Sequence, residues 1–311
     1  MKNWVSYQNG NYKVSLNTVT GTKIRENDED FFDAEFPESA DVKITNKCTN
    51  PCGNGANCAF CHEGSCPTGK QSDALHSPVW ESFHPYSEIA LGGGDVLEYP
   101  DLVPLLKRLK SLNLIANITV HQNHFEHNFD LIKKLSDEKL IYGLGVSLDR
   151  VTPEFIDKMK QFPNGVIHVI NGIVTGVQLI ALAHNDLKIL ILGYKTVRRG
   201  NKLYHSNVGY AIDRRKDLLY DGLEKILKEN WFKVVSFDNL AIKQLKPQRF
   251  VSEDYWNTCF MGEDYNSMTS ASMYIDLVEN EFARNSCDVN HRFKIKDKTV
   301  TEMYQFLKGL K

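Results

Sequence analysis

Long apolar runs are missing from the sequence. No stretch reaches the roughly 18 apolar residues that a membrane helix needs, because polar residues such as His184 and Asp186 interrupt even the most apolar region, residues 175–192. Residues 1–10 also lack the apolar run of a signal peptide. We therefore expect a cytoplasmic protein with no membrane partner.

A dominant charge of one sign is also missing. The formal net charge is -2 and the sequence pI is about 6.6, so the chain lacks the basic footprint of a nucleic-acid-binding protein. We do not expect nucleic acid as a partner. One basic run, residues 195–202, is interpreted as a solvated loop, although Lys195, Arg198 and Arg199 could bind an anionic group of a substrate.

Cysteine is scarce outside one short window. Five of the seven cysteines lie in residues 46–66, NKCTNPCGNGANCAFCHEGSC. An odd number argues against a complete set of disulfides, and cytoplasmic thiols stay reduced. The window therefore indicates a metal site or a catalytic site.

The first 40 residues form a lead-in to the main pattern. Residues 12–16 and 20–24 alternate between apolar and polar side chains, as two short strands do, and Asn17 and Gly21 are turn residues. We expect a β-hairpin over residues 1–40.

From residue 41 a rhythm of strands and helices begins. Leucines at helical spacing after Pro100, and a capping Thr152 before Pro153, mark two of the helices. Such alternation implies parallel strands joined by right-handed crossovers. The apolar runs that we interpret as strands are residues 42–45, 89–91, 118–120, 143–148, 166–170, 188–192 and 233–237.

This number of units suits a barrel better than a small open sheet. The sequence therefore predicts an α/β fold with a partial (β/α)6 TIM-like barrel over residues 41–250. After about residue 250 the rhythm breaks. We expect residues 251–311 to form a C-terminal extension that caps the barrel, with a strand near residues 271–278 and a closing helix near residues 300–310.

The cysteine window follows the first barrel strand, where parallel βα folds place their active sites. Cys58 and Cys61 form a C-x2-C pair that can bring two thiolates to one metal centre. With Cys48 and Cys52 they supply enough thiolates for a closed tetrahedral zinc site. A zinc-stabilised binding module is thus one hypothesis, although a zinc knuckle does not explain the barrel. The other hypothesis is a catalytic iron–sulfur cluster.

Several segments, in strand order, resemble the radical S-adenosylmethionine (radical SAM) superfamily. CAFCHE, residues 58–63, resembles the family's cysteine–aromatic–cysteine pattern after the first strand. LGGGDVLEYPDL, residues 91–102, resembles the glycine–glycine–acid segment after the second strand. GLGVSLD, residues 143–149, resembles the fourth strand, and ILILGYKTVRRG, residues 189–200, resembles the sixth. The resemblance covers about residues 41–245.

The resemblance implies a [4Fe-4S] cluster that three cysteines hold, with SAM bound to the fourth iron. It implies that reductive cleavage of SAM gives a 5'-deoxyadenosyl radical, which abstracts a hydrogen atom from the substrate. An electron donor such as flavodoxin or ferredoxin is then a partner. Mapped onto this sequence, the cluster ligands are Cys48, Cys58 and Cys61, and the SAM-binding residues are Phe60, Gly92, Gly93, Gly94, Asp95, Ser147 and Asp149.

The sequence departs from the family pattern in places. With Cys48 as the first ligand the spacing is C-x9-C-x2-C, whereas the commonest family spacing is C-x3-C-x2-C. Cys52 would give C-x5-C-x2-C. We choose Cys48 because it lies where the first strand ends, and we interpret Cys52 and Cys66 as bystanders. Asp95 and Val96 replace the commoner glutamate and proline.

Three histidines follow the third strand in place of the family's T-N-G segment. His121, His124 and His127 are spaced three residues apart. They look like a metal set, but we expect them at the surface or at the edge of the core.

The C-terminal part bears on the substrate. Many relatives that act on peptides carry a SPASM-type domain with further clusters, but only Cys259 and Cys287 are present here, so we expect one cluster. Cys259 is a candidate hydrogen-atom donor to a substrate radical, although a buried structural cysteine is the simpler interpretation. The substrate is a peptide or protein side chain in one hypothesis, and a small metabolite or nucleotide-derived molecule in another.

Overall fold

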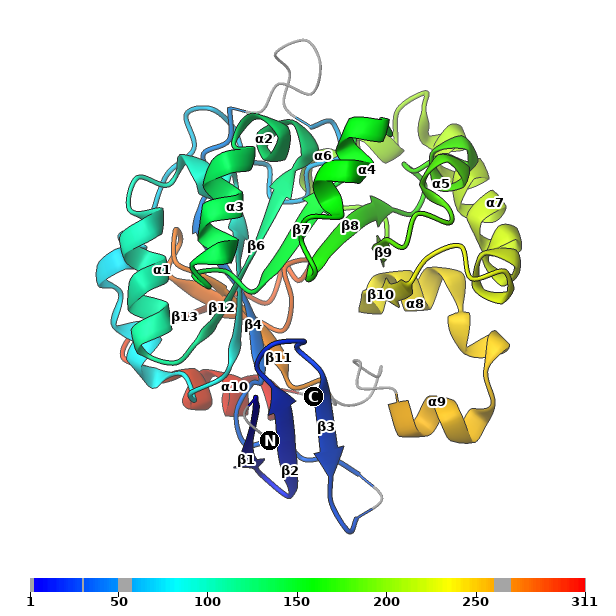
Figure 1. Ribbon diagram of the computed structural model, residues 1–311. Helices are drawn as coiled ribbons and strands as arrows, with labels where there is room; N and C mark the ends of the chain where they lie inside the picture. Colours follow the sequence, from blue (N-terminus) through cyan, green and yellow to red (C-terminus); the bar gives the residue numbers. More distant parts are fainter. Residues whose placement is uncertain (1–2, 30, 50–57, 260–269, 311) are drawn as a thin grey trace.

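The computed structural model describes residues 3–29, 31–49, 58–259 and 270–310. Figure 1 shows a large twisted sheet with helices packed against it and a small separate sheet near the N-terminus. Within the described residues, no helix combines the length and the apolar character that crossing a membrane requires.

A 10-stranded sheet forms the main body, in the spatial order β10-β9-β8-β7-β6-β5-β4-β11-β12-β13. Strands β4 to β10 pair in parallel, each beside the next along the chain. This arrangement confirms the predicted α/β fold with a partial TIM-like barrel. The bounds are β4 Ser39–Thr45, β5 Glu88–Gly93, β6 Ile115–His121, β7 Gly143–Ser147, β8 Gly165–Ile170, β9 Lys188–Leu192 and β10 Val234–Phe237.

Some helices begin at a capping side chain. Thr152 accepts a hydrogen bond from the N–H of Phe155, as its place before Pro153 predicted. The α-helices are α1 Leu102–Ser111, α2 Gln122–His127, α3 Phe129–Asp137, α4 Pro153–Met159, α5 Gly176–Leu182, α6 Arg198–Tyr204, α7 Gly209–Lys228, α8 Asn239–Leu245, α9 Glu253–Cys259 and α10 Val300–Lys308. The 3-10 helices are η1 Ala74–His76, η2 Pro78–Ser82, η3 Val96–Glu98 and η4 Pro247–Phe250.

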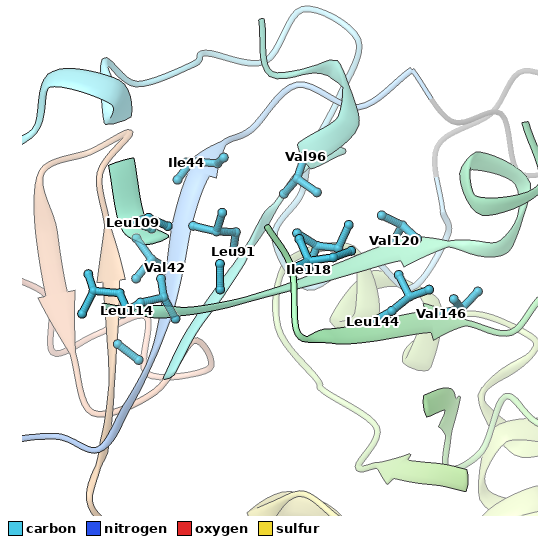
Figure 2. Packing of buried hydrophobic residues seen from close by; sticks show 14 of the residues in the cluster. Val42, Ile44, Leu91, Val96, Leu109, Leu114, Ile118, Val120, Leu144 and Val146 are labelled. Atoms are coloured by element: carbon cyan, nitrogen blue, oxygen red, sulfur yellow. The ribbon is translucent and has the colours of Figure 1, made fainter. Parts of the chain in front are cut away.

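Alternate residues of the parallel strands form the core (Figure 2). Val42 lies opposite Leu91, Leu91 opposite Ile118, and Ile118 opposite Leu144, so one apolar row crosses four strands. The row packs against helices such as α1, whose Leu109 belongs to the same cluster. Because side chains alternate along a strand, the residues between these apolar ones point to the opposite, inner face of the sheet.

A three-stranded antiparallel sheet precedes the barrel, in the order β1-β2-β3. The predicted hairpin is present as β2 and β3, with Asn17 accepting hydrogen bonds from two turn N–H groups. Gly21 has a φ of 73° in that turn, which favours glycine. The sequence analysis missed β1. The bounds are β1 Trp4–Asn9, β2 Tyr12–Asn17 and β3 Lys23–Glu26.

The C-terminal segment adds strands to the barrel sheet. β11 pairs in parallel with β4, on the side away from β5, and β12 and β13 follow as antiparallel strands. The strand expected near residues 271–278 is present as β11, and the closing helix is present as α10. The bounds are β11 Ser272–Asp276, β12 Glu281–Ala283 and β13 Phe293–Lys294.

Candidate functional site

Polar side chains gather on the inner face of the sheet. The register places His121 opposite Ser147, and Ser147 opposite His168. On the other side of the barrel, Lys43 of β4 lies opposite Gly92 of β5. These residues lie towards the carboxyl ends of their strands, where parallel folds carry their functional loops.

The cysteine loop leaves the carboxyl end of β4. The N–H of Cys48 donates to the carbonyl of Cys66 at 2.9 Å, and the N–H of Cys66 donates to the carbonyl of Asn46 at 3.1 Å. The N–H of Cys61 donates to the carbonyl of Cys58 at 3.1 Å, which closes a tight turn. Cys48, Cys58 and Cys61 are partly buried and belong to no disulfide. The chain leaving β4 and the chain returning after Cys61 are therefore held side by side.

Glu63, two residues after Cys61, anchors the loop to the barrel. Its carboxylate is buried and lies 3.2 Å from the Nζ of Lys43 and 3.1 Å from a guanidinium nitrogen of Arg198. The hydroxyl of Tyr274 donates to it at 3.3 Å. Strand β4, helix α6 and strand β11 thus all contact one side chain of the cysteine loop.

The charges in this network balance. Lys43 also pairs with Asp276 at 3.1 Å, so its buried ammonium has two carboxylate partners. Burial alone would raise the pKa of Glu63, but the neighbouring His62, Lys43 and Arg198 hold it below its ordinary value. Glu63 is therefore ionised and paired at neutral pH.

The basic run at residues 195–202 is not the solvated loop that we expected. Most of it belongs to helix α6. Arg199 donates to the carbonyl of Cys58 at 3.0 Å and to that of Ser65 at 2.8 Å, and Arg198 donates to the carbonyl of Glu63 at 2.8 Å. The fixed fork of guanidinium donors matches several carbonyls at once, so these two arginines hold the cysteine loop.

The glycines after β5 allow a close approach of the chain to this loop. A Cβ on Gly94 would collide with the carbonyl of Lys47, and one on Gly93 with the carbonyl of Thr45. Gly93 also has a φ of 107°, which favours glycine. Backbone packing alone therefore explains these two glycines. A Cβ on Gly92 would meet nothing within 4 Å, so Gly92 leaves space for a ligand.

Asp95 faces helix α2. Its carboxylate contacts the Nδ1 of His124, and its other oxygen accepts from the N–H of Leu97 at 3.1 Å. Glu98 accepts hydrogen bonds from the hydroxyl and, at 2.9 Å, from the N–H of Thr49, the residue after Cys48. In the part of the chain that the structure describes, Asp95, Glu98 and His124 are the one set of three ligating side chains within 4.8 Å of one another.

Of the three histidines at the end of β6 and in α2, His124 alone joins this set, and the sequence analysis gave it no role. Burial would lower its pKa, but the neighbouring Asp95 and Cys48 raise the pKa of His124 to about 9. His121 instead caps α2, and His127 is exposed. A histidine spacing cannot reveal such a difference, because the partners come from other loops.

Ser147 and Asp149 have different surroundings. Ser147 ends β7 on the inner face, between His121 and His168 in the register. The carboxylate of Asp149 lies 3.3 Å from Arg150, and its side chain is 40% exposed. Ser147 is thus available to a ligand inside the barrel, whereas Asp149 already has a charged partner near the surface.

Lys195 brings a positive charge to the inner face. Its Nζ donates to the Oγ of Ser286 at 3.1 Å. Burial, together with the charge of Lys195, lowers the pKa of His168 to about 4, so this imidazole is neutral at neutral pH. Burial raises the pKa of Cys287, although Lys195 opposes this. An ammonium, a neutral imidazole and a protonated thiol are therefore electrostatic neighbours here.

The remaining predicted residues are only partly described. Phe60 is partly buried, and its carbonyl lies beside Gly200 of α6. Cys52 lies outside the described residues, and so does the side chain of Cys259, which ends α9. The roles assigned to them stay predictions.

One cavity lies away from these side chains. It has a volume of about 1090 Å³ and lies among α7, β10, α8 and α9, where Phe250, Tyr255 and Trp256 line it. None of the predicted site residues whose side chains the structure describes lines it.

The three thiols are a donor set that either a zinc ion or an iron–sulfur cluster can use. A single tetrahedral zinc draws its sulfur ligands close together, with Zn–S bonds of about 2.3 Å. Cys48, Cys58 and Cys61 do not form such a compact set, although all three are described. A cubic cluster binds each thiolate to a different iron and so spaces the ligands more widely. Three free thiols on one loop are the donors that a [4Fe-4S] cluster with one open iron needs, so the chemistry of the residues present fits such a cluster.

Solved structures resemble this chain over nearly its whole length, although no family model and no curated protein matches the sequence. SuiB of Streptococcus suis bound to the precursor peptide SuiA is 12% identical, with a TM-score of 0.60, over 98% of this chain and 87% of that one. SuiB bound to S-adenosylmethionine is 14% identical, with a TM-score of 0.59 and the same coverage. The protein anSMEcpe with bound AdoMet is 14% identical, with a TM-score of 0.50, over 86% of this chain and 77% of that one.

SuiB and anSMEcpe are radical SAM enzymes. At these identities the likeness concerns the fold, and the fold agrees with the strand-by-strand resemblance in the sequence. The chain therefore shares the fold of SuiB and anSMEcpe.

Proposed function

We propose that this protein is a radical SAM enzyme with one [4Fe-4S] cluster that Cys48, Cys58 and Cys61 hold. The observation that carries the proposal is the position of these thiols, on the loop after β4 of a sheet whose fold is that of SuiB and anSMEcpe. When bound, the cluster would pass an electron to SAM and so produce the radical that removes a hydrogen atom from the substrate.

The protein's own contribution to this chemistry is to hold the ligands in place. Arg199 fixes the carbonyl of Cys58, and Glu63 ties the segment after Cys61 to Lys43 of the barrel. Functional sites need such supporting contacts, because ligands that move by an ångström lose their geometry. The cysteine loop is therefore restrained on both sides of the Cys58–Cys61 pair.

We propose that SAM binds on the inner face, beside Gly92 and Ser147. Gly92 leaves space there, and Ser147 offers a hydroxyl from the end of β7. The side of this site nearest the cysteine loop would be formed by Phe60, Gly93, Gly94 and Asp95. Asp149, paired with Arg150, would contribute least.

We propose a peptide or protein side chain as the substrate. Support comes from SuiB, which has a similar fold and whose structure is bound to the precursor peptide SuiA. Within the barrel, Lys195 would bind an anionic group of the substrate, because no carboxylate of the described residues lies within ion-pair distance of its ammonium. His168 and Cys287 would then be the neutral groups nearest to the substrate.

Anaerobic reconstitution with iron and sulfide tests the cluster and the reaction. We expect about four irons per chain, by the stoichiometry of one such cluster, and formation of 5'-deoxyadenosine from SAM in the presence of dithionite. A colourless protein that binds one zinc, retains no iron and forms no 5'-deoxyadenosine would be a zinc-stabilised binding module instead.

The class of substrate is tested with the reconstituted, cluster-containing enzyme and two kinds of candidate substrate, short peptides and small-molecule metabolites. A short peptide encoded beside the gene for this protein should increase the formation of 5'-deoxyadenosine. Mass spectrometry should show that the peptide itself has lost hydrogen. A small-molecule metabolite that does so, while every such peptide is inert, would contradict a peptide substrate and leave the radical chemistry in place.

A further inference from the structure

Three polar side chains come together beside the cysteine loop. Asp95 follows β5, Glu98 ends η3 and His124 belongs to α2, and one ligating atom of each lies within 4.8 Å of the other two. The Oδ2 of Asp95, the Oε2 of Glu98 and the Nε2 of His124 are buried, and none has a hydrogen-bond partner among the described residues. Buried polar atoms nearly always have a partner, so a group that satisfies all three side chains would fit here.

The other oxygen of each carboxylate is already held in place. The Oδ1 of Asp95 accepts from the N–H of Leu97 at 3.1 Å. The Oε1 of Glu98 accepts from the N–H of Thr49 at 2.9 Å and from its hydroxyl. Carboxylates that bind a metal are commonly oriented by such hydrogen bonds to their second oxygen. Each carboxylate therefore presents one oxygen without a donor in a fixed direction.

The charges of the three side chains do not balance. The side chain of Asp95 is 2% exposed and that of His124 is 13% exposed. Asp95 contacts the Nδ1 of His124, and among the described residues no lysine or arginine pairs with Asp95 or Glu98. Buried carboxylates are normally paired or bind a metal. Two carboxylates and a neutral imidazole carry the charge that one divalent cation neutralises.

We propose that Asp95, Glu98 and His124 form a binding site for a divalent transition-metal cation, separate from the cysteines. Carboxylate oxygens combined with one imidazole suit ions such as Mn²⁺, Fe²⁺ or Zn²⁺, whereas thiolates select softer partners. The three side chains line a cavity of about 410 Å³, which has room for water molecules that complete the coordination.

The cation would join three segments of the chain. Asp95 and Glu98 come from the connection after β5, and His124 comes from α2. Glu98 is also hydrogen-bonded to Thr49, the residue after Cys48. The site goes beyond the proposed function, because none of its ligands is a cysteine, yet it would stabilise the chain where the cysteine loop begins.

A proton on His124 is the alternative to a cation. An imidazolium would neutralise only one of the two carboxylates. It would also leave its own Nε2, the Oδ2 of Asp95 and the Oε2 of Glu98 without hydrogen-bond partners, as they are in the structure. The cation is the better occupant because it can bind one atom of each side chain.

Titration of the full chain with Mn²⁺, with the unbound ion measured by EPR, tests the site. Mn²⁺ is the probe because it prefers oxygen ligands to thiolates. The wild type is titrated both cluster-free and after reconstitution, beside Glu98→Gln, His124→Gln and a matched control, His127→Gln. His127 lies on the same helix and lines the same cavity, but it is exposed and outside the set of three.

We expect the wild type and His127→Gln to bind one Mn²⁺ per chain in both states of the protein. Glu98→Gln and His124→Gln should bind it more than about tenfold more weakly, since the loss of a residue behind a metal ligand already has an effect of that size. Mn²⁺ should also raise the Tm of the wild type and leave that of these two variants unchanged. Glu98→Gln keeps an oxygen for Thr49, and His124→Gln carries the test if Glu98→Gln does not fold.

Two results would overturn this inference. One is a wild type that binds no Mn²⁺, which would identify the three side chains as an internal ion pair that holds a proton. The other is equal binding by the wild type, Glu98→Gln and His124→Gln, which would place the ion elsewhere. A wild type that binds Mn²⁺ but retains no iron after reconstitution would refute the proposed function and support the cation site.

Discussion

Glu38 and Glu63 are two buried carboxylates with closely similar surroundings and different consequences. Glu38 precedes β4, is 1% exposed, and accepts from Arg25 through both oxygens at 2.8 and 2.9 Å. Glu63 is 5% exposed and lies near two cations as well. Each also accepts from a tyrosine hydroxyl, Tyr12 for Glu38 and Tyr274 for Glu63.

The difference lies in what each carboxylate connects. The partners of Glu38 come from β2 and β3, so this glutamate fixes the N-terminal sheet to the first strand of the barrel. The partners of Glu63 come from β4, α6 and β11, and Glu63 lies two residues from Cys61. The same physics therefore stabilises the fold at one place and positions the candidate cluster loop at the other.

The largest expected effect on stability is that of Glu38→Gln. Removing one partner of a buried ion pair costs about 3 kcal/mol when the remaining cation keeps some access to solvent, and Arg25 is 23% exposed. The measurement is urea unfolding of the cluster-free protein. Glu88→Gln, which breaks a more exposed contact to Lys23, is the control and should cost less than about 1 kcal/mol. Equal losses in the two variants would contradict the role of Glu38.

Compared with Glu38→Gln, the Glu63→Gln variant should lose less unfolding free energy but bind less iron. We expect about 2 kcal/mol, the range for a hydrogen bond to a charged group, because Lys43 keeps Asp276 as a partner. After anaerobic reconstitution, Glu63→Gln should retain less iron than Glu38→Gln, although it is the more stable of the two. A higher iron content in Glu63→Gln than in Glu38→Gln would contradict the claim that Glu63 positions the cysteine loop.

Acid should weaken both networks. The folded-state pKa of Glu38 and of Glu63 lies below the ordinary value, despite burial, because of the cations beside them. Each contribution is fully present above about pH 4.3, where the unfolded glutamates ionise, and is lost as the pH falls through the folded-state pKa. Unfolding free energies measured from pH 7 down to pH 3 should fall less steeply in Glu38→Gln than in the wild type.

The smallest effects should come from the two tyrosine hydroxyls. The hydroxyl of Tyr12 lies 2.7 Å from Glu38, whereas that of Tyr274 lies 3.3 Å from Glu63. We expect Tyr12→Phe to cost about 1 kcal/mol, as a typical hydrogen bond does, and Tyr274→Phe to cost less. Urea unfolding of both variants measures the difference, and a larger loss for Tyr274→Phe would contradict the geometry.

The sequence predicted the fold well, because its signals are local. Apolar runs of strand length, a cap such as Thr152 and a turn residue such as Gly21 act within a few residues of their own position. β1 was missed because its chain carries no strong alternation, and its pairing with β2 defines it.

The candidate site was predictable only where it followed the strand order. Cys48, Gly92 and Ser147 lie at strand ends, as the motifs indicated. The contacts of Arg199 and His124 were not predicted, because their partners come from loops that are distant in sequence. Gly93 and Gly94 have a packing reason that a motif cannot separate from ligand binding.

The most direct test of the central claim is the iron content of two cysteine variants after anaerobic reconstitution. Cys48 is held beside the end of β4 by its hydrogen bond to Cys66, whereas Cys52 was rejected as a ligand on the sequence alone. We predict that Cys48→Ala loses the cluster, as Cys58→Ala and Cys61→Ala do, and that Cys52→Ala keeps most of its iron. A cluster that survives in Cys48→Ala and is lost in Cys52→Ala would contradict the account.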